Sequence, residues 1–141
     1  MKTGILGGTF NPIHYGHLRA AEEVRGMLVL DKILFIPSGK PAFKKTGFVS
    51  ARHRYDMTKI AIKNNPFFEI SGLEIKNRGI SYSVDTLSKL AFKHKNTEFF
   101  FILGIDAFLD LPKWKLPARL MELTNLVIIL RPGFSFIDLS S

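Results

Sequence analysis

The chain of 141 residues contains no cysteine, and this absence excludes several kinds of site at once. There can be no disulfide framework, no thiolate nucleophile and no cysteine-bound zinc, whereas Mg²⁺ bound through oxygen atoms stays open. Long apolar runs are also lacking: the longest, at residues 99–105, is far shorter than the ~18 residues that a membrane span needs. No leader peptide is evident after Met1. We therefore expect one domain over residues 1–141, located in the cytoplasm and without membrane attachment.

Acidic residues are scarce, with 12 Asp and Glu against 20 Lys and Arg and a formal net charge of +8. Many of the cations fall between Lys40 and Lys63, where Asp56 is the only acid. This field predicts an anionic partner, for which nucleic acid, acidic lipid headgroups and phosphorylated metabolites all qualify. A merely solvated basic surface is the alternative. Nucleic acid is not expected, because base-stacking aromatics are not interleaved with these cations.

Short β-branched or aromatic runs alternate with amphipathic stretches along the chain. Strands are predicted at residues 3–6, 32–37, 67–71, 98–103 and 125–130. This alternation predicts an α/β fold, a Rossmann-like doubly wound parallel sheet of about five strands flanked by helices. One helix is expected to begin after Ser50, with Met57, Ile60 and Ala61 on its apolar face. Ligands of such sheets bind beyond the carboxyl ends of the strands.

The residues that follow the first predicted strand are unusual. Residues 7–17 (GGTFNPIHYGH) match neither of the common glycine-rich nucleotide fingerprints. Two glycines let a ligand approach the backbone closely, and His14 and His17 share one face of the first helical turn. With the free N–H groups of a helix start, this arrangement predicts a phosphate site at which both imidazoles donate hydrogen bonds. Metal ligation by the pair is the alternative, disfavoured because no third histidine or acid lies nearby.

Residues 7–17 resemble the signature of the HxGH nucleotidyltransferase superfamily, whose members join a nucleoside triphosphate to a phosphate-bearing acceptor and release pyrophosphate. Within it, the chain is similar to bacterial nicotinate-nucleotide adenylyltransferases. Matching segments occur in the order of that branch and cover nearly the whole chain: 37–45 (PSGKPAFKK), 54–57 (RYDM), 78–87 (RGISYSVDTL), 103–106 (LGID) with Trp114, and 131–133 (RPG). The resemblance implies adenylyl transfer from ATP to nicotinate mononucleotide in NAD biosynthesis. It implies Mg²⁺ bound through the ATP phosphates and no protein metal site.

The resemblance also implies roles for particular residues, with His14 and His17 as the catalytic pair. The residues expected at ATP are Gly8, Thr9, Phe10, His14, Gly16, His17, Gly104 and Asp106. Those expected at nicotinate mononucleotide are Lys44, Tyr82, Ser83, Thr86, Trp114 and Arg131. Trp114 would stack on the nicotinate ring, whose carboxylate the residues at 82, 83 and 86 would hold.

Several of these residues also have a structural alternative. Asp106 and Ser83 could be helix N-caps, and Trp114 could be a core residue. The resemblance implies a basic lid whose cations, Lys44, Lys45 and Arg131, contact phosphate; the alternative is that they are solvated surface charge. Arg54 is expected to brace a helix rather than contact substrate.

Three features depart from the family pattern. Asn11 stands where the family more often has Asp, and Phe43 replaces the histidine usual before the lid lysine. A late Ser-Thr-x-x-Arg phosphate element has no match, so the family's C-terminal strand and helices are expected to be missing. Two other functions stay open: a related adenylyltransferase with another acceptor, such as phosphopantetheine or a nicotinamide nucleotide, and a non-catalytic nucleotide- or nucleic-acid-binding module. A homo-oligomer is compatible with either.

Overall fold

The computed structural model describes residues 1–39, 49–131 and 135–138, with the backbone alone at 131 and 135–138. In chain order, its elements are β1 (Lys2–Gly8), α1 (Tyr15–Leu28), β2 (Lys32–Pro37), α2 (Ala51–Ile62), β3 (Phe68–Ile70), α3 (Ser83–Lys93), β4 (Glu98–Gly104), α4 (Ile105–Asp110), the 3₁₀ turn η1 (Leu111–Lys113), α5 (Pro117–Leu123), β5 (Asn125–Arg131) and β6 (Ser135–Asp138). All five predicted strands are present.

The strands form one sheet in the order β3-β2-β1-β4-β5-β6. Neighbours among the first five pair in parallel, with Ile5 of β1 opposite Leu34 of β2 and Phe101 of β4. The predicted Rossmann-like arrangement is therefore confirmed. The addition is β6, which the sequence did not predict and which pairs antiparallel with β5.

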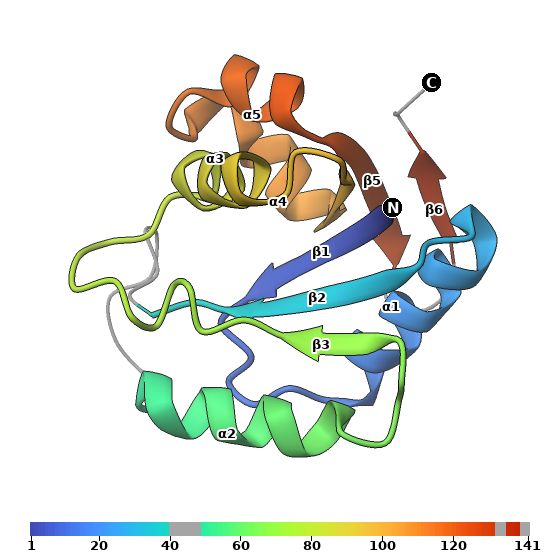
Figure 1. Ribbon diagram of the computed structural model, residues 1–141, viewed down its shortest axis with the longest axis vertical. Coiled ribbons are helices and arrows are strands. Elements are labelled where there is room, and N and C mark those ends of the chain that lie inside the picture. The colour runs from blue at the N-terminus through green and yellow to red at the C-terminus, as the bar shows by residue number, and fades with distance from the viewer. Residues whose placement is uncertain (40–48, 132–134, 139–141) are drawn as a thin grey trace.

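Helices cover both faces of the sheet, α1 and α2 on one and α3, α4 and α5 on the other (Figure 1). The alternation of side chains along β4 supplies both interfaces. Phe101 packs in a cluster with Leu87 of α3 and Leu120 of α5, whereas Phe100 packs in the other cluster with Val24 of α1. Burial on both faces is why β4 reads as an almost continuous apolar run.

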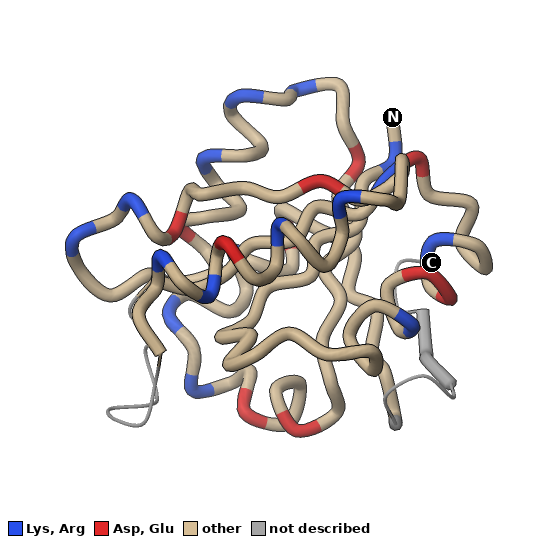
Figure 2. Tube along the Cα trace, turned by 90° about the horizontal axis from the view of Figure 1, so that it is seen from below, with Lys and Arg blue, Asp and Glu red and all other residues tan. Residues whose placement is uncertain are grey.

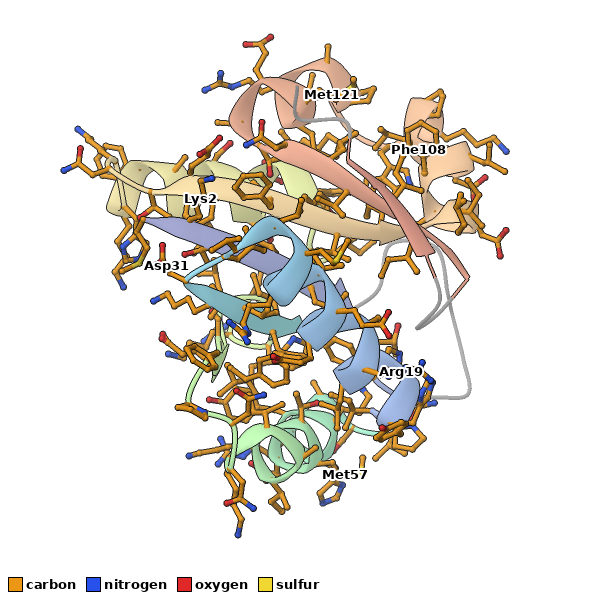
Figure 3. All side chains as sticks on the ribbon, turned by 90° about the vertical axis from the view of Figure 1, so that its right-hand side faces the viewer. Lys2, Arg19, Asp31, Met57, Phe108 and Met121 are labelled. Atoms are coloured by element: carbon orange, nitrogen blue, oxygen red, sulfur yellow. The ribbon has the colours of Figure 1, made fainter. Side chains whose placement is uncertain are left out.

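The side view shows the same division into layers. Phe108 and Met121 lie on one side of the sheet and Met57 on the other (Figure 3). Helices α4 and α5 were not predicted, because they span only six and seven residues and are too short for a helical period to stand out. No helix in the described part of the chain has both the length and the apolar character needed to cross a bilayer.

Helix α2 begins as expected but buries an unexpected face. The Ser50 hydroxyl accepts a hydrogen bond from the His53 N–H at 3.2 Å, which confirms the predicted cap. The predicted apolar face was wrong: Ile60 is 66% exposed, whereas Arg54 and Thr58 are buried. Polar side chains can occupy the buried face because backbone carbonyls satisfy them, as in the 2.8 Å bond from the Thr58 hydroxyl to the Arg54 carbonyl.

In the described part of the predicted basic stretch, an ion pair and the burial of one arginine reduce the number of free cations. Lys and Arg are spread around the described trace, with Asp and Glu among them (Figure 2). Arg52 pairs with Asp56 at 3.3 Å, and Arg54 is buried, which leaves Lys59 and Lys63 exposed on α2 or at its end. The other lysines of the stretch lie outside the described residues: Lys40, Lys44 and Lys45.

Candidate functional site

The first turn of α1 is capped by the two histidines that the sequence singles out. His14 is the N-cap, and its Nδ1 accepts a hydrogen bond from the Gly16 N–H at 3.1 Å. His17 reaches back, so that its Nδ1 accepts from the His14 N–H, also at 3.1 Å. The two residues form a reciprocal capping box in which imidazole nitrogens take the place of the usual hydroxyl and carboxylate.

This capping arrangement determines which ring nitrogen can donate to a ligand. A ring nitrogen that accepts a hydrogen bond carries no proton, so each neutral imidazole must carry its proton on Nε2. The His14 and His17 rings stack with their centroids 3.8 Å apart, and the His17 ring forms a T-shaped pair with Phe10 at 5.1 Å between centroids. The pair therefore offers two adjacent Nε2–H donors at the positive end of a helix, where no acidic residue occupies the first turn.

Gly16 is required by the same geometry. A Cβ atom added there would lie 2.9 Å from Cε1 and 3.0 Å from Nδ1 of His14. Any side chain would push the ring away from the N–H that it caps. The HxGH spacing is thus a packing requirement of this helix start as well as a feature of its chemistry.

A cleft of about 480 Å³ opens in front of this helix start. Its wall includes the loop after β1, the last residues of β4 and the segment that leads into α3, and it reaches Trp114 after η1. Strands β1 and β4 are neighbours at which the chain connections diverge to opposite sides, because β2 lies on the other flank of β1. This is the position at which doubly wound sheets bind ligands.

Most of the predicted site residues lie in the cleft wall. Those that line it are Gly8, Thr9, His14, Gly16, His17, Tyr82, Ser83, Gly104 and Trp114. Three others do not: Phe10 is a core residue, Thr86 is buried behind the wall, and Asp106 is exposed in the first turn of α4. Lys44 and the side chain of Arg131 lie outside the described residues.

The structure also decides between the alternatives for three of these residues. The N-cap of α3 is Tyr82 rather than Ser83, and the N-cap of α4 is Gly104 rather than Asp106, so neither predicted capping role is found. Trp114 is half-buried: it packs 6.3 Å from Phe101 between ring centroids and also lines the cleft. Its indole belongs partly to the core and partly to the site.

Comparison with known proteins places this arrangement in a family. The family model described as cytidylyltransferase-like matches residues 5–140. The chain belongs to this family.

Relatives within the family carry a narrower name. A "probable nicotinate-nucleotide adenylyltransferase" of Geotalea daltonii is 50% identical over 134 residues, which are 94% of this chain and 62% of the relative. One of Geobacter metallireducens is 45% identical over 142 residues, which are 100% of this chain and 66% of the relative. The chain thus spans a little under two thirds of the length of the curated relatives it matches.

Solved structures show the same fold. Plasmodium falciparum nicotinic acid mononucleotide adenylyltransferase complexed with APC has a TM-score of 0.78 at 24% identity, over 95% of this chain and 66% of that one. The same enzyme complexed with NaAD has a TM-score of 0.74 at 20% identity, over 92% of this chain and 76% of that one.

Several residues of the cleft wall were not predicted as site residues from the sequence, among them Ser38, Glu74 and Lys115. Ser38 follows β2, the neighbour of β1. It could have been predicted, because ligands of such sheets bind beyond the carboxyl ends of the strands. Its N–H donates to the Gly8 carbonyl at 2.8 Å, and its buried Oγ has no partner among the described residues. Glu74 lies in an irregular connection and carries no sequence signal. Lys115 directly follows Trp114 but stands in no recognised motif.

Glu74 is the only carboxylate among the described residues of the cleft wall. The Thr86 hydroxyl donates to its Oε2 at 2.8 Å, so the threonine contacts a residue of the cleft wall without lining the cleft itself. Burial raises the pKa of Glu74, and the Thr86 hydrogen bond partly opposes this shift. The pair links the β3–α3 connection to the first turns of α3.

The His17 ring predicts a particular pH dependence of stability. Burial, and then the charge of His14, lower the pKa of His17 to about 4. Because an unfolded histidine titrates near 6.5, the unfolded chain binds a proton between about pH 6.5 and 4 that the folded chain does not. The contribution of the neutral His17 ring to the free energy of unfolding is thus complete above about pH 6.5 and is lost as the pH falls from there to about 4. The expected slope is at most about 1.4 kcal/mol per pH unit.

Urea unfolding at pH 7 and pH 5 would measure this effect. The matched variant is His17→Gln, because glutamine at the third helical position keeps the capping acceptor but does not titrate. The pH dependence of this variant's free energy of unfolding contains the contribution of carboxylates that titrate in the same pH range. Subtracting it leaves the contribution of His17. Equal slopes in the two proteins would contradict the assignment of a lowered pKa.

Proposed function

We propose that this chain carries the adenylyl-transfer site of a nicotinate-nucleotide adenylyltransferase. The reaction joins ATP to nicotinate mononucleotide and gives nicotinate adenine dinucleotide and pyrophosphate. The observation that carries the proposal is the pair of Nε2–H donors of His14 and His17 in a cleft whose other end holds Trp114. The names of the relatives, and of the Plasmodium structures complexed with APC and NaAD, support the same pair of substrates.

The ATP end of the cleft is assigned to the helix start and the loops beside it. His14 and His17 would donate to phosphate oxygens and, with the helix dipole, stabilise the charge that builds up on the leaving pyrophosphate. The backbone of Gly8 and Thr9 allows the phosphates to approach closely. Gly104 at the β4 end of the cleft and Asp106, exposed in the first turn of α4 next to it, would contact the ribose, and Phe10 would support the His17 ring.

The nicotinate end is assigned to the opposite wall. Trp114 would stack on the ring, while Tyr82 and Ser83 at the start of α3 would hold its carboxylate, and the Thr86 hydroxyl would fix the neighbouring Glu74 carboxyl group through their hydrogen bond. Lys44 and Arg131 are proposed as phosphate contacts. An oxygen of the acceptor phosphate would attack the α-phosphorus of ATP as the bond from that phosphorus to the pyrophosphate oxygen breaks.

Mg²⁺ fits this site only through the substrate. No group of three or more His, Asp or Glu in the described residues could hold a metal, and the cleft wall offers N–H donors where a metal would need acceptors. When bound with ATP, Mg²⁺ would neutralise phosphate charge. The chain's own contribution is to orient the phosphates and to donate hydrogen bonds to them.

A pyrophosphate-release assay with competing acceptors tests the proposed function. With ATP present, nicotinate mononucleotide is expected to support release at a kcat/KM at least about tenfold above that of nicotinamide mononucleotide or phosphopantetheine, because a site that pairs with a charged group rejects analogues lacking it. Preference for another acceptor would favour a related adenylyltransferase. If none of the three acceptors supports pyrophosphate release, the proposed catalytic activity of this chain is wrong.

A further inference from the structure

Lys115 is a charged residue of the cleft wall to which no role has yet been given. We propose that its ammonium group selects a carboxylate over an amide on the ring that stacks against Trp114, and thereby determines acceptor specificity. This inference rests on the proposed function and names the residue that reads the acceptor.

The position of the ammonium supports this role. Lys115 is the only Lys or Arg among the described residues of the cleft wall. Its Nζ lies 5.0 Å from the centroid of the Tyr82 ring and 2.9 Å from Oδ2 of Asp85 in the first turn of α3. Since Trp114 is its chain neighbour and Tyr82 lies beneath it, a substituent that points from the stacked ring toward Tyr82 would meet this charge.

The ion pair with Asp85 positions the Lys115 ammonium group but does not prevent it from turning toward a ligand. Both side chains are nearly half exposed, at 44% for Lys115 and 48% for Asp85. Ion pairs of this exposure contribute little to stability, so the ammonium can turn toward a ligand carboxylate at small cost. A carboxylate gains a charge-assisted hydrogen bond from this move, whereas an amide of the same shape does not.

The negative charge of Glu74 in the cleft wall requires a nearby cation if an anionic ring substituent is to bind. Its carboxyl group lines the same wall and, when ionised, repels an acidic ring substituent. The hydrogen bond from Thr86 holds the group in place, so it cannot swing away freely. With Glu74 and Asp85 both near the start of α3, Lys115 is the group that makes this end of the described cleft acceptable to an anion.

The test compares Lys115→Gln with Lys113→Gln, a lysine two residues away that is outside the described cleft wall, 80% exposed and 4.0 Å from Asp110. The dissociation constants of nicotinate and nicotinamide mononucleotide are measured by quenching of Trp114, the only tryptophan. Lys115→Gln is expected to weaken nicotinate nucleotide binding roughly tenfold and to change nicotinamide nucleotide binding less than about twofold. Lys113→Gln is expected to change neither, and Lys115→Arg is expected to keep the preference.

The outcomes separate this inference from the proposed function. If the unmodified chain binds neither nucleotide, the proposed function fails. If the unmodified chain binds the nicotinate nucleotide and Lys115→Gln binds it equally well, the role of Lys115 alone is overturned. Equal weakening of both nucleotides would also overturn it, because that result indicates lost packing rather than lost charge recognition. Asp85→Asn frees the ammonium and is expected to leave nicotinate nucleotide binding unchanged or tighter; a tenfold loss would overturn the proposal, because it would contradict an ammonium that leaves Asp85 to meet the ligand.

Discussion

Replacement of His17 by alanine is expected to lower kcat for pyrophosphate release by at least roughly 100-fold, the usual effect of losing one donor to a developing negative charge. The reason is local: the His17 Nδ1 is occupied by the His14 N–H, so its Nε2–H is the only ring donor left for a phosphate oxygen. Steady-state kinetics with ATP and nicotinate mononucleotide would measure this loss. Turnover close to that of the unmodified chain would remove the catalytic role of His17.

Variants at His14 separate catalysis from helix capping. His14→Ala removes the acceptor for the Gly16 N–H and is expected to lower the free energy of unfolding by about 1 kcal/mol. His14→Ser keeps a good N-cap acceptor and should restore that stability without restoring turnover. If serine rescued activity, the imidazole would act only as a cap and the proposed phosphate contact would be wrong.

Replacement of Arg54 by methionine is expected to destabilise the fold by roughly 3–5 kcal/mol, the scale for removing one partner from a buried charged network. Arg54 is 1% exposed, and its guanidinium donates to the backbone carbonyls of Thr9, Ser38, Gly39 and Val49 at 2.6–3.0 Å. These carbonyls come from the loop after β1, the loop after β2 and the segment before α2. Without the arginine, these partly buried carbonyls lose their donor, and methionine of similar length supplies none.

Thermal unfolding would detect this loss as a decrease of at least about 10 °C in Tm. The matched control is Arg52→Met, two residues away, where the side chain is 76% exposed, pairs with Asp56 at 3.3 Å and lies 5.7 Å from the Tyr55 ring centroid. Its expected change is under about 0.5 kcal/mol. Arg54→Lys keeps the charge but has no planar fork to reach carbonyls from three segments, so it should resemble methionine more than arginine. A stable Arg54→Met variant would show that the loops are held by other contacts.

Arg54 illustrates the limit of reading a helix from its pattern. The prediction that Ile60 lies on the buried face of α2 was wrong. Arg54 was predicted to brace a helix, and it does have a bracing role, but for other segments. Arg54 braces the loops at the strand ends rather than the helix itself, because carbonyls distant in sequence converge on it. Hydrophobic periodicity cannot anticipate a buried cation whose partners are backbone atoms of other segments.

The cleft shows the same division between local and distant signals. His14, Gly16 and His17 were predicted as site residues because their spacing within one turn of chain is visible in the sequence. Ser38, Glu74 and Lys115 were not, since each comes from a different connection and reaches the wall only after the layers pack.

The sequence by itself determined the five parallel strands, the helix start with its two imidazoles and the resemblance to a nucleotidyltransferase. These features depend on residues close together in the chain: apolar runs that must be buried on both faces, and a turn of helix whose spacing sets its own hydrogen bonds. The tertiary structure alone decided that Arg54 joins the loop after β1 to both ends of the β2–α2 connection, that Thr86 bonds to Glu74 and that Lys115 lies over Tyr82. Those contacts join residues up to 45 positions apart, and no local pattern encodes which distant groups the packed layers bring together.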